Sequence, residues 1–198
     1  MAALRLGVIG YTSEWAAMML YESLFSGKFD DKFVLTAIAG REKSKKEAMM
    51  KLARKIKERA GELEGNLYND YNWRLGKNAN LLKNFSTLLG MVDSGRVNYS
   101  LINGEQTPPK KFFNSVDAVA IYVPNNLHVN QLEESLKYGK HTLLEKPSVV
   151  VIDKNSKADR THLDRAKVAY ANRRPGIIVQ DAEHYSAKQA AKALFDNI

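Results

Sequence analysis

The sequence contains no cysteine, and this absence removes several kinds of chemistry at once. Disulfide frameworks, thiolate zinc sites, iron–sulfur clusters and cysteine nucleophiles all require that side chain. No run approaches the roughly 20 apolar residues that a membrane span needs, and the first residues lead into an apolar stretch without the features of a signal peptide. We therefore expect a soluble, cytoplasmic protein with no membrane partner and no metal site.

Acidic residues are too few to balance the basic ones, since 22 Asp and Glu accompany 30 Lys and Arg and leave a net charge of +8. Such an excess can mark a surface that binds nucleic acid. The densest basic stretch, residues 41–59, is however interrupted by Glu42, Glu47 and Glu58, which is typical of a solvated helix face. We therefore expect no nucleic-acid partner.

Apolar runs bounded by turn residues alternate with stretches of helical periodicity, and this alternation predicts an α/β fold with a parallel sheet. The predicted strands are residues 4–9, 32–39, 97–102, 118–123, 141–144 and 176–180. The predicted helices are residues 14–25, 44–61, 81–92, 127–138, 161–171 and 187–195. Residues 65–80 and 106–111 have the composition of loops and connections.

The first predicted strand ends in a turn over residues 10–13, which a predicted helix follows. Dinucleotide folds hold a pyrophosphate on free amides at a helix N-terminus, and three glycines allow its close approach. Of these only Gly10 is present, because Thr12 and Trp15 occupy the other two places. Thr12 and Ser13 can still offer hydroxyl groups and amides to a phosphate. A purely structural turn agrees with the pattern equally well.

Arg41 comes directly after the second predicted strand. Sites for NAD usually have a carboxylate there, which accepts hydrogen bonds from the ribose hydroxyl groups. Arg41, with Lys43 and Lys45 behind it, would instead hold a 2′-phosphate bidentately. The pattern favours NADP over NAD as the cofactor, and the alternative is that Arg41 merely faces solvent.

The most informative motifs lie in residues 116–150, where two strands each end in a distinctive turn. The motif residues are Pro124, Asn125, His128, Gly139, Lys140, His141, Glu145, Lys146 and Pro147. With these motifs the sequence resembles the Gfo/Idh/MocA family of sugar and polyol dehydrogenases. The resemblance implies a doubly wound Rossmann domain over residues 1–179. Residues 180–198 would then begin a second, α+β domain that is otherwise missing and that makes the parent protein a homo-oligomer.

The resemblance also implies roles for individual residues. Lys146 is the expected catalytic lysine, which can orient the cofactor, contact the substrate, polarise the reacting oxygen or relay a proton. The expected cofactor-binding residues are Gly10, Thr12, Ser13, Arg41, Pro124, Asn125, His128, Glu145, Lys146 and Pro147. For His128, a role as a helix cap or as a core residue is an equal alternative, and His141 is expected to be structural.

A second resemblance concerns the substrate. Residues 183–188, Glu-His-Tyr-Ser-Ala-Lys, resemble the Asp-His-Tyr-Leu-Gly-Lys motif of glucose-6-phosphate dehydrogenases. By this resemblance His184, Tyr185 and Lys188 bind a sugar phosphate, and Glu183 takes the place of the aspartate. A neutral sugar or polyol, or simple burial of these side chains, are the alternatives. We expect an NADP-dependent sugar or sugar-phosphate dehydrogenase. A non-catalytic nucleotide-sensing or interaction domain with the same fold is the alternative.

Overall fold

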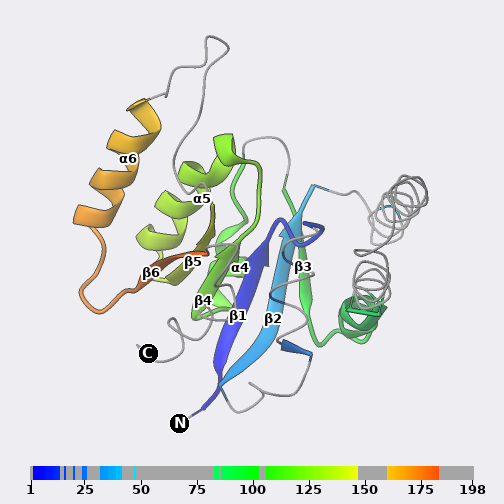
Figure 1. Cartoon of the computed structure of the whole chain (residues 1–198). Coiled ribbons are helices and arrows are strands. Elements are labelled where there is room, and N and C mark those ends of the chain that lie inside the picture. The colour runs from blue at the N-terminus through cyan, green and yellow to red at the C-terminus, as the bar shows by residue number, and fades with distance from the viewer. Residues whose placement is uncertain are drawn as a thin grey trace, which may run out of the picture.

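A computed structural model describes residues 2–13, 16, 20, 24–25, 32–41, 47, 83–84, 86–102, 106–146 and 160–182. Within these ranges six parallel strands form one sheet in the order β3-β2-β1-β4-β5-β6 (Figure 1). The strands are β1 (Leu4–Ile9), β2 (Phe33–Gly40), β3 (Asn98–Leu101), β4 (Ala118–Ile121), β5 (His141–Glu145) and β6 (Val179–Ala182). This order is that of a doubly wound Rossmann sheet, and it confirms the predicted fold class.

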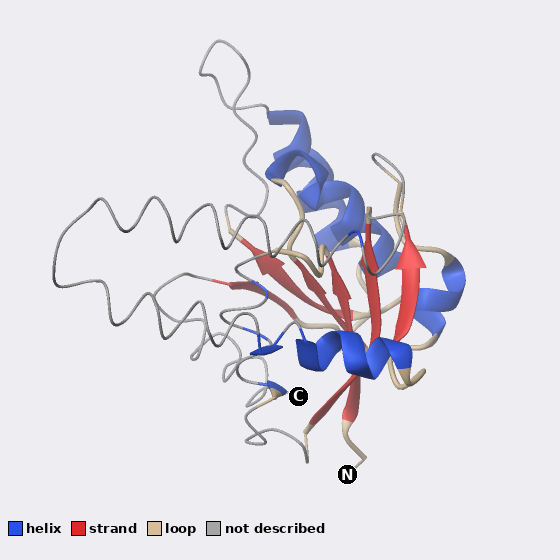
Figure 2. Ribbon diagram, turned by 90° about the vertical axis from the view of Figure 1, so that its right-hand side faces the viewer, coloured by secondary structure: helices blue, strands red, loops and turns tan. Residues whose placement is uncertain are grey.

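Helices lie on both sides of the sheet, as Figure 2 shows. Those whose bounds are defined are α4 (Lys110–Asn114), α5 (Asn125–Lys137) and α6 (Arg160–Ala171). Residues 86–93 form a further helical stretch, in agreement with the helix predicted over residues 81–92. None of the helices in the described ranges combines the length and the apolar character that crossing a bilayer requires.

Two hydrophobic clusters fill the spaces between the sheet and its helices. Because strand side chains alternate, Val8 of β1 joins the first cluster and Ile9 joins the second. Leu88, from the helical stretch of residues 86–93, packs in the first cluster, whereas Phe113 of α4 and Leu132 of α5 pack in the second. The central strands are therefore buried on both faces, which explains why β4 is apolar at every position.

Two elements differ clearly from the sequence prediction, whereas the bounds of the other labelled strands and helices differ by at most two residues. Residues 106–111 were expected to form a connection, yet α4 begins inside this stretch directly after Pro109. Strand β6 covers residues 179–182 rather than 176–180, because Gly176 adopts a left-handed conformation with φ of 81° in a preceding turn. The sheet therefore extends three residues beyond residue 179, while the division into domains stays a prediction.

Several predicted segments lie wholly or mostly outside the described residues. They are residues 14–25, 44–61, 65–80 and 187–195.

An ion pair joins β1 to the start of β4 at the amino edge of the sheet. The Arg5 guanidinium donates from Nη2 to Asp117 Oδ1 at 2.6 Å and from Nε to Oδ2 at 3.0 Å, and the Arg5 backbone N–H donates to Oδ2 at 2.9 Å. These bonds from Arg5 hold the pKa of the Asp117 carboxyl below its ordinary value, although partial burial opposes the effect. The amino edge of the sheet is thus held together by side-chain bonds as well as by the backbone hydrogen bonds of the strands.

Candidate functional site

Residues from four adjacent strands meet at the carboxyl edge of the sheet. The register pairs Ile9 of β1 with Ala39 of β2 and with Ile121 of β4, and it pairs Ile121 with Leu144 of β5. The next residues of these strands therefore form one row across the sheet, in the order Gly40, Gly10, Tyr122 and Glu145. We call this the edge row. Open α/β sheets bind their ligands at this edge.

Gly10 allows β1 to pass very close to the end of β4. Its φ is 81°, and a Cβ atom added there would lie 2.2 Å from the carbonyl oxygen of Tyr122. The Gly10 N–H donates to Ala39 O at 2.9 Å, and the Ser13 N–H donates back to Gly10 O at 2.9 Å, which closes the turn. The side chains of Thr12 and Ser13 are partly exposed at this turn. The one glycine that the motif retains therefore stands where no other residue fits.

Helix α5 begins at the same edge, directly after β4. Its N-cap is Pro124, no side chain caps its first turn, and that turn contains no acidic residue. Pro124 and Asn125 are both exposed. The positive end of the helix dipole is therefore available to an anion at the edge row.

His128 lies in the core below this turn and has no exposed surface. Its Nε2 lies 2.7 Å from the carbonyl oxygen of Val123, so Nε2 carries the proton and donates it. Of the roles that the sequence allowed, this position corresponds to the core role, in which His128 fixes the β4–α5 turn. His141 accepts the backbone N–H of Ile178 on Nδ1 at 3.2 Å, and burial lowers its pKa.

Charged side chains stand at both ends of the edge row. Arg41 is exposed directly after β2, and Glu145 and Lys146 are half-buried at the tip of β5. Burial raises the pKa of the Glu145 carboxyl, and the positive charge of Lys146 partly offsets that rise. The remaining predicted site residues lie outside the described ranges: Pro147, Glu183, His184, Tyr185 and Lys188.

Along the carboxyl edge of the sheet, in the order β2, β1, β4 and β5, the groups are a guanidinium after β2, a glycine turn after β1, the start of a helix after β4 and an ammonium after β5. Three strand spacings of about 4.8 Å separate β2 from β5, so the row is about 14 Å long. An extended, phosphate-bearing molecule could lie along it, with its anionic groups near Arg41 and the turn and its far end near Lys146. These residues therefore fit a dinucleotide.

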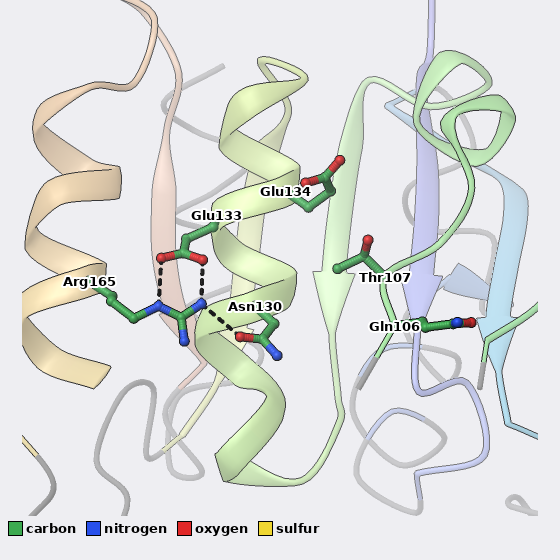
Figure 3. Close-up of a pocket in the computed structure, with 6 residues that line it drawn as sticks. All are labelled: Gln106, Thr107, Asn130, Glu133, Glu134 and Arg165. Carbon is green, nitrogen blue, oxygen red and sulfur yellow. Dashed lines mark hydrogen bonds and ion pairs between the residues drawn. The ribbon is translucent and has the colours of Figure 1, made fainter. Parts of the chain in front are cut away.

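A separate hollow of about 460 Å³ lies among α5, α6 and the segment before α4 (Figure 3). Arg165 extends from α6 and donates to both carboxylate oxygens of Glu133 and, at 2.8 Å, to Asn130 Oδ1 on α5. These groups satisfy one another and clamp α6 to α5. No motif in the sequence indicates this clamp, since the pairing depends on how two helices pack.

Among the described residues, no group of three or more His, Asp and Glu side chains could hold a metal ion.

Comparison with known proteins places the chain among oxidoreductases. Residues 4–171 match the model of the GFO_IDH_MocA family, described as an oxidoreductase family with an NAD-binding Rossmann fold. The structure of scyllo-inositol dehydrogenase from Lactobacillus casei has a TM-score of 0.52 and 15% identity, over 98% of this chain and 41% of that one. KijD10, a 3-ketoreductase from Actinomadura kijaniata solved with NADP and TDP-benzene, has a TM-score of 0.48 and 20% identity, over 98% and 42%.

The chain thus spans about two fifths of the length of these solved structures. No curated protein matches the sequence.

Proposed function

The chain belongs to the Gfo/Idh/MocA family of oxidoreductases, whose Rossmann fold binds NAD, and from this premise we propose that it forms the cofactor-binding part of an NADP-preferring dehydrogenase. The complete enzyme transfers a hydride between nicotinamide and a hydroxyl group of a sugar or sugar phosphate. The observation that carries the proposal is the order of groups along the edge row, with a guanidinium at one end, an ammonium at the other and a glycine turn between them.

Each part of the edge has a task in this proposal. Arg41 holds the 2′-phosphate that distinguishes NADP from NAD. The turn of Gly10, Thr12 and Ser13 holds the pyrophosphate, and Pro124 with Asn125 at the start of α5 supports the nicotinamide half. His128 contributes indirectly, by fixing that turn through its bond to Val123 O.

Lys146 is the proposed catalytic residue. The bound nicotinamide supplies the chemistry of hydride exchange, and the ammonium of Lys146 orients the substrate oxygen and stabilises charge that develops on it. Glu145, at the end of β5, and Pro147 are proposed to bind the cofactor beside Lys146. In this proposal the proton-transferring residue and the subunit interface belong to a second domain that follows β6.

The substrate class rests on residues 183–188. His184, Tyr185 and Lys188 supply an imidazole, a phenol and an ammonium, a set suited to the dianion of a sugar phosphate. Glu183 stands where the glucose-6-phosphate dehydrogenase motif has an aspartate. We therefore propose a sugar phosphate or a neutral sugar as the substrate, as equal alternatives.

Cofactor preference is tested by Arg41→Ser. We expect this change to weaken NADPH binding about tenfold, through loss of one charge-assisted contact, and to leave NADH binding unchanged. Calorimetric titration of the chain with both cofactors measures this effect. Arg96→Ser, which removes another exposed arginine two residues before β3, is the matched control and should change neither affinity. Equal weak binding of both cofactors by the unaltered chain would show that Arg41 merely faces water.

Catalysis is tested by Lys146→Ala in the complete enzyme, with glucose 6-phosphate and glucose as trial substrates. We expect kcat to fall by about 10²- to 10⁴-fold, as for other groups that stabilise the transition state or transfer protons, with little change in NADPH affinity. Lys167→Ala, at an exposed position on α6, should leave kcat unchanged. An unaltered kcat in Lys146→Ala refutes the catalytic lysine. Cofactor binding without turnover of any sugar would favour a nucleotide-sensing domain.

A further inference from the structure

Tyr122 and Glu145 are neighbours in the edge row, and both side chains project to the same side of the sheet. Ala118 and Ala120 of β4 belong to the first hydrophobic cluster, as does Tyr122 two residues further along. On β5, Leu143 belongs to that cluster, so Glu145 projects to the same side by the two-residue alternation of a strand. An aromatic ring and a carboxyl group are therefore paired at the end of adjacent strands.

The Tyr122 side chain is buried at this end of the sheet. Only 7% of Tyr122 is exposed, and it packs in the same cluster as Tyr11 of the glycine turn. Burial raises the pKa of the Tyr122 phenol far above its ordinary value, and the negative charge of Glu145 raises it further. The phenol therefore stays neutral, and its ring lies on the same side of the sheet as the Glu145 side chain, one strand away.

Within the described part of the chain, few titratable groups affect the pKa of the Glu145 carboxyl. The titratable group that acts on the Glu145 carboxyl is Lys146, from its own strand, and the Glu145 charge in turn acts on the phenol of Tyr122, from β4. Its register partner on β6 is Ala182, which carries no charge. A change at Tyr122 should therefore reach Lys146 chiefly through Glu145.

Resting on the proposed function, we propose that Tyr122 is a positioning residue for Lys146. The ring keeps water away from Glu145, so the carboxylate attracts the Lys146 ammonium through a medium less polar than water and holds it at the edge row. Lys146 contacts the cofactor, whereas Tyr122 touches neither cofactor nor substrate. The ring is the important part, and the hydroxyl group is dispensable.

This arrangement makes cofactor binding sensitive to acid. When Glu145 gains a proton, its attraction for Lys146 disappears and the ammonium is free to turn into solvent. Because desolvation raises the pKa of Glu145, the loss begins at a higher pH than an exposed glutamate would allow. Removal of the ring should therefore move the transition to lower pH.

The test follows the Glu145 carboxyl carbon by NMR as a function of pH. In the unaltered chain we expect its midpoint above about 4.3, the ordinary value for glutamate. Tyr122→Phe keeps the ring and should retain that midpoint, whereas Tyr122→Thr admits water and should return it to the ordinary value. Tyr99→Thr removes a tyrosine on the same side of the sheet but on β3, and should have no effect.

The same variants are titrated calorimetrically with NAD⁺, which lacks a 2′-phosphate that would itself titrate in this range. The pH at which affinity has fallen threefold should move together with the Glu145 midpoint, and this acid transition should be absent in Glu145→Gln. An ordinary midpoint in the unaltered chain overturns the inference even if Tyr122→Thr does not fold. Normal NAD⁺ binding with an unmoved midpoint in Tyr122→Thr overturns this inference alone. Absence of NAD⁺ binding by the unaltered chain overturns the proposed function, and the inference with it.

Discussion

Gly10 is fixed by two constraints that can be separated by experiment. Its backbone has a positive φ of 81°, and an added Cβ would lie 2.2 Å from Tyr122 O. Gly95 shares the first constraint, with φ of 75°, but a Cβ added there would meet open space, with no contact within 4 Å. Comparison of the two glycines therefore isolates the cost of the close approach between β1 and β4.

We expect Gly95→Ala to lower the free energy of unfolding by about 1 kcal/mol, the cost of a left-handed backbone for alanine. Gly10→Ala should lower it by about 3 kcal/mol, because the carbonyl of Tyr122 must also shift within a packed core. Urea denaturation of both variants gives the two values. Equal losses would mean that the contact with Tyr122 relaxes freely and that Gly10 is needed for its φ alone.

Single residues differed in how far the sequence could place them. The motif positions Gly10 and Lys146 could be assigned to strand ends, because turn residues directly follow apolar runs, and the register now aligns these ends in one row. The environment of His128 could not be assigned, because a histidine near a helix start suits a cleft and a core equally. Its burial depends on packing between β4 and α5, which sequence spacing does not specify.

At the scale of elements, the ion pair between Arg5 of β1 and Asp117 before β4 gives a prediction for the free energy of unfolding. Asp117→Asn should lower the free energy of unfolding at pH 7 by about 1 kcal/mol, a value reduced for the partial exposure of this ion pair. The pKa of Asp117 is lower in the folded chain than its ordinary value of 3.8. The stabilisation is therefore complete above pH 3.8 and is lost as the pH falls through the lower, folded value.

Urea denaturation at pH 7 and at successively more acidic pH measures this difference, which should shrink in acid. Asp164→Asn is the matched control, because Asp164 lies 3.6 Å from Lys167 in an exposed pair on one helix. It should change the stability very little at any pH. A difference between Asp117→Asn and the unaltered chain that persists undiminished in acid would show that the carboxylate charge is unimportant.

The elements themselves were predicted with uneven success, for physical reasons. The central strands were located closely because burial on both faces makes them continuous apolar runs. Helix α4 was missed because it has five residues and begins after a proline pair, which resembles a connection. Strand β6 was placed too early because Ile177 and Ile178 are apolar, although the turn at Gly176 precedes it.

At the scale of the whole molecule, periodicity predicted a parallel sheet but not the order of its strands. The order of the strands depends on which face of the sheet each connecting helix covers. We expected a Rossmann order only because residues 116–150 resemble a known family. The family match over residues 4–171 and the observed order of the sheet agree with it. The candidate site follows from that order, since β2, β1, β4 and β5 become neighbours only when β1 lies between β2 and β4.

The central position of β1 also has a consequence for synthesis on the ribosome. One neighbour, β2, emerges soon after it, but the residues that pair with its other side come later, as the 112-residue separation of Arg5 and Asp117 shows. At a translation rate of about 5 to 20 residues per second, β4 is synthesised about 6 to 22 s after β1. During this time the peptide groups along one side of β1 have no partner strand. The yield of folded protein should therefore depend on translation speed and on chaperones that shield this nascent edge.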